Sequence, residues 1–291
     1  MSEPSLDVVR SWWRTALIDT APGQIHIRGY PIEQLIGAVS FPAMVWLLLR
    51  GDLPSRAQAD LLEAAMVASV DHGPHAPSIA VARMAITCGL GLNGAVACGV
   101  NTLGDIHGGA GQQCMELYRE VAAAWEATGS LERAASEALD RLLATPGAFV
   151  PGFGHRFHQV DPRAGRLLAL VDQAAAAGVV EGRFAAVGRA VEAALAARKG
   201  RRIPMNIDGV TAVVYAELGF EPPLARGLFI LSRSVGILAH AWEQSRQGER
   251  IKGPIPPQVD YTYEGPPPRP LPHDTWRESQ GRRRTMGIQE A

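Results

Sequence analysis

The sequence predicts an all-α protein. Long stretches of the chain are filled by Ala, Leu, Glu and Arg, which favour helices, whereas alternating runs of β-branched residues are nearly absent. Hydrophobic residues make up 47% of the 291 residues, enough for a sizeable core in one large or two smaller domains. We therefore expect helices along the chain and no real sheet.

The helices can be placed from their apolar spacing and their end signals. The apolar stretch from Pro31 to Arg50 is followed by Gly51, a typical helix stop. Ser55 stands in cap position before a helix with apolar residues at helical spacing. Pro222 opens a long helix that runs to about Gln247. Further helices are expected over 114–128, 131–144, 164–177, 184–198 and 210–218.

Charge and cysteine usage narrow the functional class. The formal net charge is −1, which argues against nucleic-acid binding, and the basic runs 198–202 and 282–284 are interpreted as solvated loop and tail. Cys88, Cys98 and Cys114 form no CxxC, as expected for reduced thiols. The start of the chain does not resemble a signal peptide, and the longest apolar run, Phe41 to Leu49, is too short to span a membrane. We expect a soluble cytoplasmic protein.

Three short polar segments, far apart in sequence, are the strongest functional signal. They read GDIHGGA around His107, PGFGHRFHQVDPR with His155 and Arg163, and PMNIDG around Asp208. Each places an ionisable side chain beside glycine or proline, and glycine lets backbone approach a ligand closely. The segments predict a site for proton chemistry, with domain boundaries near them: a large domain over 1–107 and 214–291, and a smaller inserted domain over 108–213.

Two apparent motifs have simpler explanations. The stretch 89–94 matches GxGxxG, but the residues before it look helical, which favours a connection between helices over a dinucleotide site. The pairs His72/His75 and His155/His158 are interrupted by glycine and proline and lack a third ligand, so no metal site is expected.

The remaining candidates each have two interpretations. Asp208 follows the good N-cap Asn206, and an acidic residue in a first helical turn is stabilised by the helix dipole even without a catalytic role. The extended segment 203–206 before it and the two histidine segments favour catalysis. Arg233 lies within an apolar helix, either in a buried ion pair with an internal acid or as a clamp for a substrate carboxylate; Arg163 suits the same clamp. Two arginines with several histidines predict a small polycarboxylate as ligand.

Taken in order, these segments resemble the citrate synthase superfamily. The matching stretches are IHIRGYPIEQL, GDLPS, DHGPHAPSIAVAR, GDIHGGA, PGFGHRFHQVDPR, NIDG, LGF and LFILSRSVGILAHAWEQ, which together cover most of the chain. The resemblance implies a two-domain helical fold with an inserted smaller domain, and a homodimer or higher homo-oligomer with the active site in the cleft.

The resemblance also implies roles for individual residues. Asp208 matches the base that removes the α-proton of acetyl-CoA, His107 the histidine that stabilises the enol, and His155 the histidine that polarises the oxaloacetate carbonyl. His72, Arg163 and Arg233 match oxaloacetate ligands. Gly152, Phe153 and Gly154 match a segment that contacts coenzyme A, which is a substrate thioester here; no permanent cofactor is expected.

Departures from the full-length synthase pattern refine the expected reaction. GDLPS runs almost directly into DHG, a shortened layout that resembles citryl-CoA lyases and the lyase portion of ATP-citrate lyase. Gly253 replaces an arginine usual in synthases, and Gln159 stands near a basic contact to the CoA phosphates. We expect a citryl-CoA lyase that uses a citryl-CoA synthetase partner. A citrate or 2-methylcitrate synthase and a non-catalytic acyl-CoA-binding or carboxylate-binding subunit are the alternatives.

Overall fold

The computed structural model describes residues 6, 8, 11–155 and 158–269. The chain divides into two compact units, 1–252 and 253–291. The helices and strands named below belong to the first unit, and residues 253–269 form neither helix nor strand. The basic run 282–284 lies outside the described residues.

A small antiparallel sheet opens the first unit, so the expectation of no sheet is wrong for this stretch. It consists of β1 (Ile18–Ala21), β2 (Gln24–Ile27) and β3 (Tyr30–Pro31), in the order β1-β2-β3. The turns contain Gly23 and Gly29 at positive φ. Strands of four and two residues are too short for a clear alternating pattern, which is why the sequence did not reveal them.

The apolar stretch 31–50 contains two helices rather than one. The short α2 (Ile32–Leu35) is separated from α3 (Phe41–Arg50) by a turn with Gly37 at φ 78°. Ser40 caps α3 by accepting a hydrogen bond from the backbone N–H of Ala43. The predicted stop is confirmed, because Gly51 adopts the left-handed conformation at the end of α3.

The other predicted helices are confirmed, and a further one begins within the GxGxxG stretch, where only a connection to a helix was expected. They are α4 (Arg56–Ser69), α5 (Pro77–Thr87), α6 (Leu92–Asn101), α7 (Ala110–Thr128), α8 (Leu131–Leu143), α9 (Pro162–Ala176), α10 (Arg183–Lys199), α11 (Ile207–Glu217) and α12 (Pro222–Arg246). Ser55 forms a capping box with Gln58 at the start of α4. The GxGxxG stretch joins α5 to α6, as expected for a connection between helices.

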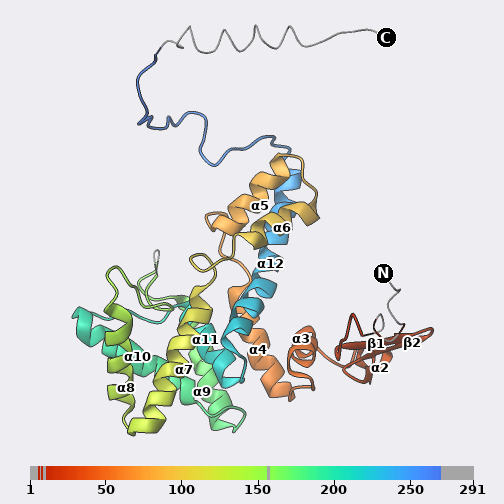
Figure 1. Cartoon of the computed structure of the whole chain (residues 1–291), viewed down its shortest axis with the longest axis vertical. Helices are drawn as coiled ribbons and strands as arrows, with labels where there is room; N and C mark the ends of the chain where they lie inside the picture. The colour runs from red at the N-terminus through yellow and green to blue at the C-terminus, as the bar shows by residue number, and fades with distance from the viewer. Residues whose placement is uncertain (1–5, 7, 9–10, 156–157, 270–291) are drawn as a thin grey trace. The chain divides into compact units, whose positions relative to one another are not determined.

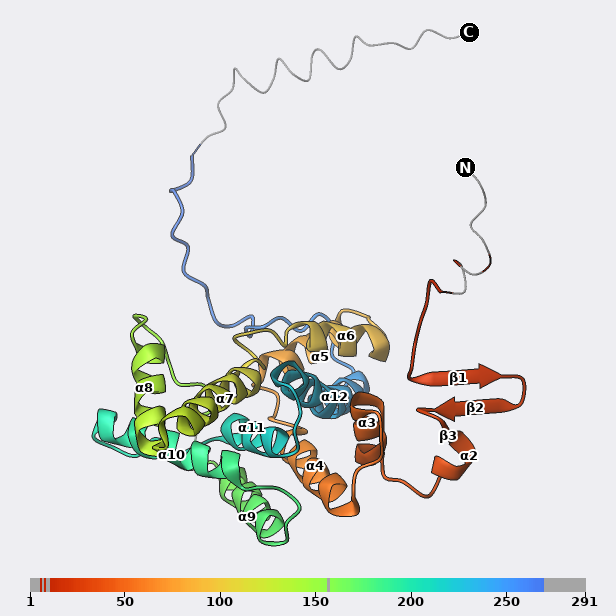
Figure 2. The same ribbon diagram turned by 60° about the horizontal axis from the view of Figure 1, so that its bottom comes forward.

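A central helix, α11, organises the main core. It packs against α4, α7, α9 and α10, and Figures 1 and 2 show it among them. From Ile207 to Ala216 every residue of α11 is buried except Asp208. A helix that is apolar all round is expected at the centre of a core, and the one exception, Asp208, is a predicted site residue in the first turn of this helix.

A second, smaller core lies along the C-terminal half of α12. It joins α5 and α6 to that helix through Ile79, Ala95, Ile237 and their neighbours (Figure 1). The chain passes between the two cores in three places, at 66–75, 104–113 and 229–236, judged from the buried residues on either side. Each passage contains a predicted site residue. The division into a large and an inserted domain remains a prediction.

Among the described residues, α12 is long and apolar enough to cross a membrane by length and composition. A core helix of a soluble protein meets the same criterion, and α12 packs against α4, α5, α6 and α7.

Candidate active site

The site begins at the N-terminus of α11. Asn206 caps this helix, and its Oδ1 accepts hydrogen bonds from the backbone N–H groups of Asp208 (2.9 Å) and Gly209 (3.2 Å). This cap fixes the first turn of the helix and therefore the carboxylate of Asp208. The predicted N-cap is confirmed.

The glycine segment 152–154 docks directly on this helix start. The carbonyl of Gly152 accepts from the Asn206 N–H (2.9 Å), the Asn206 side chain donates to the Gly154 carbonyl (2.7 Å), and the Gly154 N–H donates to the Pro204 carbonyl (2.8 Å). Gly152 has φ +83°, and a Cβ there would lie 2.5 Å from the Cys114 Sγ. Only glycine allows so close an approach, so two segments about fifty residues apart in sequence form one rigid unit.

Asp161, a residue that the sequence did not single out, ties a third segment to the same place. It is buried and caps α9. Its carboxylate accepts from the Ile207 backbone N–H (3.0 Å) and from Nε (2.9 Å) and Nη2 (2.8 Å) of Arg163. The paired guanidinium and the N–H groups hold the pKa of this carboxyl below its usual value, against the opposing effect of burial. Asp161 therefore fixes the plane of the Arg163 guanidinium and anchors α11.

Both predicted arginines meet the C-terminal end of α4. Arg163 Nη1 donates to the Ala68 carbonyl (3.4 Å), and Arg233 Nε donates to the Ser69 carbonyl (3.1 Å). Unsatisfied carbonyls at a helix C-terminus carry partial negative charge and favour cations. Arg233 is buried and stacks over the Phe229 ring at 4.8 Å. Its Nη atoms make no hydrogen bond within the described part of the chain, which suits a ligand carboxylate better than an internal ion pair.

His107 is held at the N-terminus of α5. Its Nε2 lies 3.2 Å from the backbone N–H of Ser78 and 3.0 Å from the Ser78 hydroxyl. A backbone N–H can only donate, so Nε2 accepts and the ring proton sits on Nδ1. Burial and the charge of Arg233 lower the pKa of His107. The ring is therefore neutral at pH 7 and presents an N–H donor on its other side.

The rings of His72 and His155 lie beside one another. Their ring centroids are 5.6 Å apart. The Nδ1 of His155 accepts a hydrogen bond from the His158 backbone N–H (3.2 Å), which leaves the ring proton on Nε2. Partial burial lowers the pKa of both rings, and for His72 the charges of Arg163 and Arg233 act in the same direction.

Both arginines and Asp161 act electrostatically on the carboxyl group of Asp208. Burial raises the pKa of its carboxyl, while the positive charges of Arg233 and Arg163 oppose that rise. A carboxylate with a raised pKa is a stronger base than an ordinary aspartate, and the two guanidiniums favour its ionised form. Arg233 also acts on His107 and His72, so all six predicted side chains share one electrostatic environment.

A cavity of about 610 Å³ opens beside His155. Its lining includes Gly154, His158, Gln159, Arg201 and Arg202. The basic run 198–202 is interpreted from sequence as solvated loop, but Arg198 and Lys199 end α10, and Arg201 and Arg202 reach the edge of the site. Arg202 pairs with Glu192 at 2.8 Å, whereas Arg201 makes no ion pair or hydrogen bond to the described residues. This end of the cavity consequently carries net positive charge.

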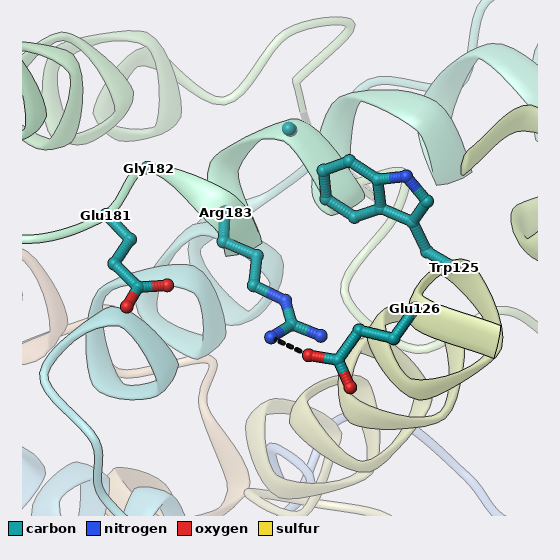
Figure 3. Close-up of a pocket in the computed structure, with 6 residues that line it drawn as sticks. Trp125, Glu126, Glu181, Gly182 and Arg183 are labelled. Atoms are coloured by element: carbon teal, nitrogen blue, oxygen red, sulfur yellow. Dashed lines mark ion pairs between the residues drawn. The ribbon is translucent and has the colours of Figure 1, made fainter. Parts of the chain in front are cut away.

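A second cavity, of about 410 Å³, is lined by residues 125–126, 181–183 and 186, which include none of the predicted site residues. Figure 3 shows Arg183 turned toward Glu126, with which it forms an ion pair at 2.5 Å. The guanidinium also donates to the Ala122 carbonyl (2.9 Å). Its charge is thus already neutralised. No group of three or more metal-ligating side chains occurs among the residues that the structure describes.

Comparison with known proteins identifies the family. The family model "Citrate synthase, C-terminal domain" matches residues 6–60 and 54–254. A citrate synthase of Haloferax volcanii is 30% identical over 80% of this chain and 57% of its own length. The chain spans about half the length of the curated relatives it matches.

Solved structures agree on the fold. Citryl-CoA lyase from Hydrogenobacter thermophilus superposes with a TM-score of 0.80 and 31% identity over 92% of this chain and 99% of that chain. ATP citrate lyase from Methanosaeta concilii, in complex with (3S)-citryl-CoA, gives a TM-score of 0.72 at 21% identity over 91% of this chain and 43% of that chain. The shared family model, the all-α fold and the His, Arg and Asp residues gathered around α11 lead to one conclusion: the chain belongs to the citrate synthase family.

Proposed function

We propose that this protein is a citryl-CoA lyase, which interconverts citryl-CoA with acetyl-CoA and oxaloacetate. The observation that carries the proposal is the placement of Asp208 and His107 around the buried Arg233, with Arg163 and the histidines beside it. An α-proton of a thioester is a very weak acid, so its removal needs a base together with stabilisation of the enolate oxygen.

The residues are suited to separate steps. In the condensation direction, Asp208 takes a proton from the methyl carbon of acetyl-CoA, while the Nδ1–H of His107 donates to the thioester oxygen. The enol carbon then bonds to the carbonyl carbon of oxaloacetate, and the carbonyl oxygen receives its proton from Nε2 of His155. Cleavage is the reverse: the hydroxyl proton leaves to His155, the C–C bond breaks, and Asp208 returns a proton to carbon. Condensation therefore leaves Asp208 with one proton more and Nε2 of His155 with one fewer, and transfer of a proton from Asp208 to His155 resets the enzyme. Cleavage begins from the opposite form, with Asp208 protonated and Nε2 of His155 without its proton.

The cationic groups bind the dicarboxylate. Arg163 and Arg233 offer guanidiniums whose Nε atoms are already fixed by Asp161 and by the Ser69 carbonyl, which leaves the outer nitrogens of Arg233 for a carboxylate. Pre-organised guanidiniums bind carboxylates bidentately with little loss of side-chain entropy. His72, exposed at the mouth of the site, adds a further donor.

The positively charged cavity supports coenzyme A as the carrier of the acyl group. It begins at Gly154 and His155, beside the reacting centre, and reaches Arg201. A phosphate-bearing substrate whose thioester lies at His155 would place its negative charge near Arg201 and Arg202. These arginines would supply the positive charge that the neutral Gln159 lacks.

An exposed apolar stripe on α12 supports a homodimer. Leu231, Val235, Leu238 and Trp242 are 45–58% exposed and follow one face of the helix. A contiguous apolar face on a soluble protein indicates an interface, and a second copy of the chain is the occupant we propose. The free thiols Cys88, Cys98 and Cys114 fit a reducing, cytoplasmic setting, where a citryl-CoA synthetase would supply the substrate.

Two measurements test the lyase. Purified protein given citryl-CoA should release acetyl-CoA and oxaloacetate, and Asp208→Asn should lower turnover by about 10²- to 10⁴-fold, the usual contribution of a general base. Unchanged turnover in that variant would remove Asp208 from the mechanism.

A citrate synthase is the second candidate, because the curated relatives carry that name. It predicts different products from citryl-CoA, namely citrate and free coenzyme A. The TM-score of 0.80 and 31% identity to a citryl-CoA lyase, together with the short link between GDLPS and DHG, favour the lyase. Tight binding of acyl-CoA or oxaloacetate with no turnover would instead indicate a non-catalytic binding subunit.

A further inference from the structure

Three successive turns of α12 contact the end of α4 and the residues that follow it, 69–71. Arg233 donates to the Ser69 carbonyl, and three residues later Gly236 packs so closely on Asp71 that a Cβ would lie 2.9 Å from its Oδ1 and 3.2 Å from its Cα. Four residues further, Nε2 of His240 lies 3.2 Å from Oδ1 of Asp71. Spacings of three and four place all three residues on one helix face. The first belongs to the proposed substrate site, and the third has no role in it.

His240 is the centre of an ordered polar chain. Its Nδ1 lies 3.1 Å from Nη1 of Arg83 on α5, and an arginine can only donate, so Nδ1 accepts and the ring proton sits on Nε2. Arg83 is itself fixed by Glu243 (2.5 Å) and Gln247 (3.0 Å). The side chains of His240 and Arg83 are only 18% and 17% exposed. Arg83 therefore sets the tautomer that lets His240 donate to Asp71.

Asp71, held by His240, in turn fixes the backbone around His72. Its Oδ2 accepts a hydrogen bond from the Gly73 backbone N–H (3.3 Å), two residues further along the chain. An aspartate carboxylate that accepts from the N–H two residues on closes an Asx turn around the intervening residue. That residue is His72, the proposed oxaloacetate ligand, and its side chain is exposed at the site.

We propose that His240 is a positioning residue that fixes His72 through Asp71, with Arg83 holding His240 in the required tautomer. His240 does not touch the substrate. It sets the affinity for the dicarboxylate and leaves the coenzyme A end unaffected. The effect on oxaloacetate rests on the proposed function, whereas the ordering of the turn does not.

The ordering of the turn is tested in the ligand-free full chain. Amide hydrogen exchange over 71–76 should be about 10- to 100-fold faster in His240→Ala, the range for one hydrogen bond to a charged group. His240→Gln retains an N–H donor at similar reach and should restore most of the protection. Arg119→Gln is the matched control, because it breaks an exposed ion pair with Glu221 at the other end of α12. Unchanged exchange in His240→Ala would overturn the proposal whether or not the protein is active.

Steady-state kinetics test the consequence for the substrate. In the condensation direction, His240→Ala should raise KM for oxaloacetate about tenfold, leave KM for acetyl-CoA within about twofold, and recover in His240→Gln. Equal increases in both KM values would indicate general loosening of the α5–α12 contact and would refute the positioning role. Absence of turnover in the wild-type protein would count against the lyase alone, since hydrogen exchange would still decide how the turn is held.

Discussion

Gly152→Ala is expected to destabilise the protein by about 2–5 kcal/mol. The residue has φ +83°, where an L-residue costs roughly 1–2 kcal/mol. The new Cβ would also lie 2.5 Å from the Cys114 Sγ and 2.7 Å from the Cα of Gly209. Both neighbours are buried, and one of them is backbone, so relief requires movement of α7 or α11; overpacking of this kind costs about 1–3 kcal/mol.

Gly178→Ala is the matched control for the backbone contribution. Gly178 has φ +71°, and no atom lies within 4 Å of the position that an alanine Cβ would take, so its substitution should cost only about 1–2 kcal/mol. The difference between the two variants, about 1–3 kcal/mol, isolates the contact between the glycine segment and α11. With an m-value near 3 kcal/mol/M, the urea midpoint of Gly152→Ala should fall about 1 M below wild type.

The same substitution should also affect catalysis. Displacement of the α11 start by about 1 Å would move the carboxylate of Asp208, and a misplacement of that size can lower turnover about 10²-fold. Urea unfolding followed by circular dichroism, with turnover measured well below the unfolding transition, checks both effects. Equal midpoints for Gly152→Ala and Gly178→Ala would refute the argument that the two segments form one rigid unit.

Three further predictions concern the site and the fold. Burial raises the pKa of Asp208 above the ordinary aspartate value of 3.8, and activity should be lost as the pH falls through this raised pKa. The acid limb of the kcat/KM profile should therefore shift in Asp208→Glu. An unchanged limb in that variant would assign the limb to another group. Arg233→Lys should raise KM for oxaloacetate about 10- to 100-fold in steady-state assays, because lysine lacks the planar guanidinium and the Nε hydrogen bond to the Ser69 carbonyl. An unaltered KM would exclude Arg233 as a ligand of the substrate carboxylate. Ser55→Ala should cost about 1 kcal/mol in thermal or urea unfolding through loss of the α4 capping box, with turnover unchanged.

Local signals in the sequence determined most of the helical framework. The caps Ser55 and Asn206 and the stop Gly51 are short-range features, because a cap is satisfied by backbone groups within three or four residues of it. The apolar periodicity of the long helices is equally local. The small sheet and the break between α2 and α3 were missed because their elements are too short to establish a period.

The ionisable site residues were also visible in the sequence, since His107, His155, Arg163, Arg233 and Asp208 stand out against an apolar, helical background. Sequence order and the family resemblance were enough to name them. Their roles in catalysis remain predictions, as does the division of the chain into two domains.

Only the tertiary structure decided how these residues are held. Ser78 fixes the tautomer of His107 from 29 positions away, Asp161 reaches the start of α11 across 46 positions, and His240 meets Asp71 across 169. No local pattern reports such pairs, because each depends on how separate helices pack and not on the propensities of either segment. The sequence by itself determined which ionisable groups are proposed to do the chemistry. The tertiary structure determined the tautomers of His107 and His155, the direction in which each pKa is shifted, and the residues that support them.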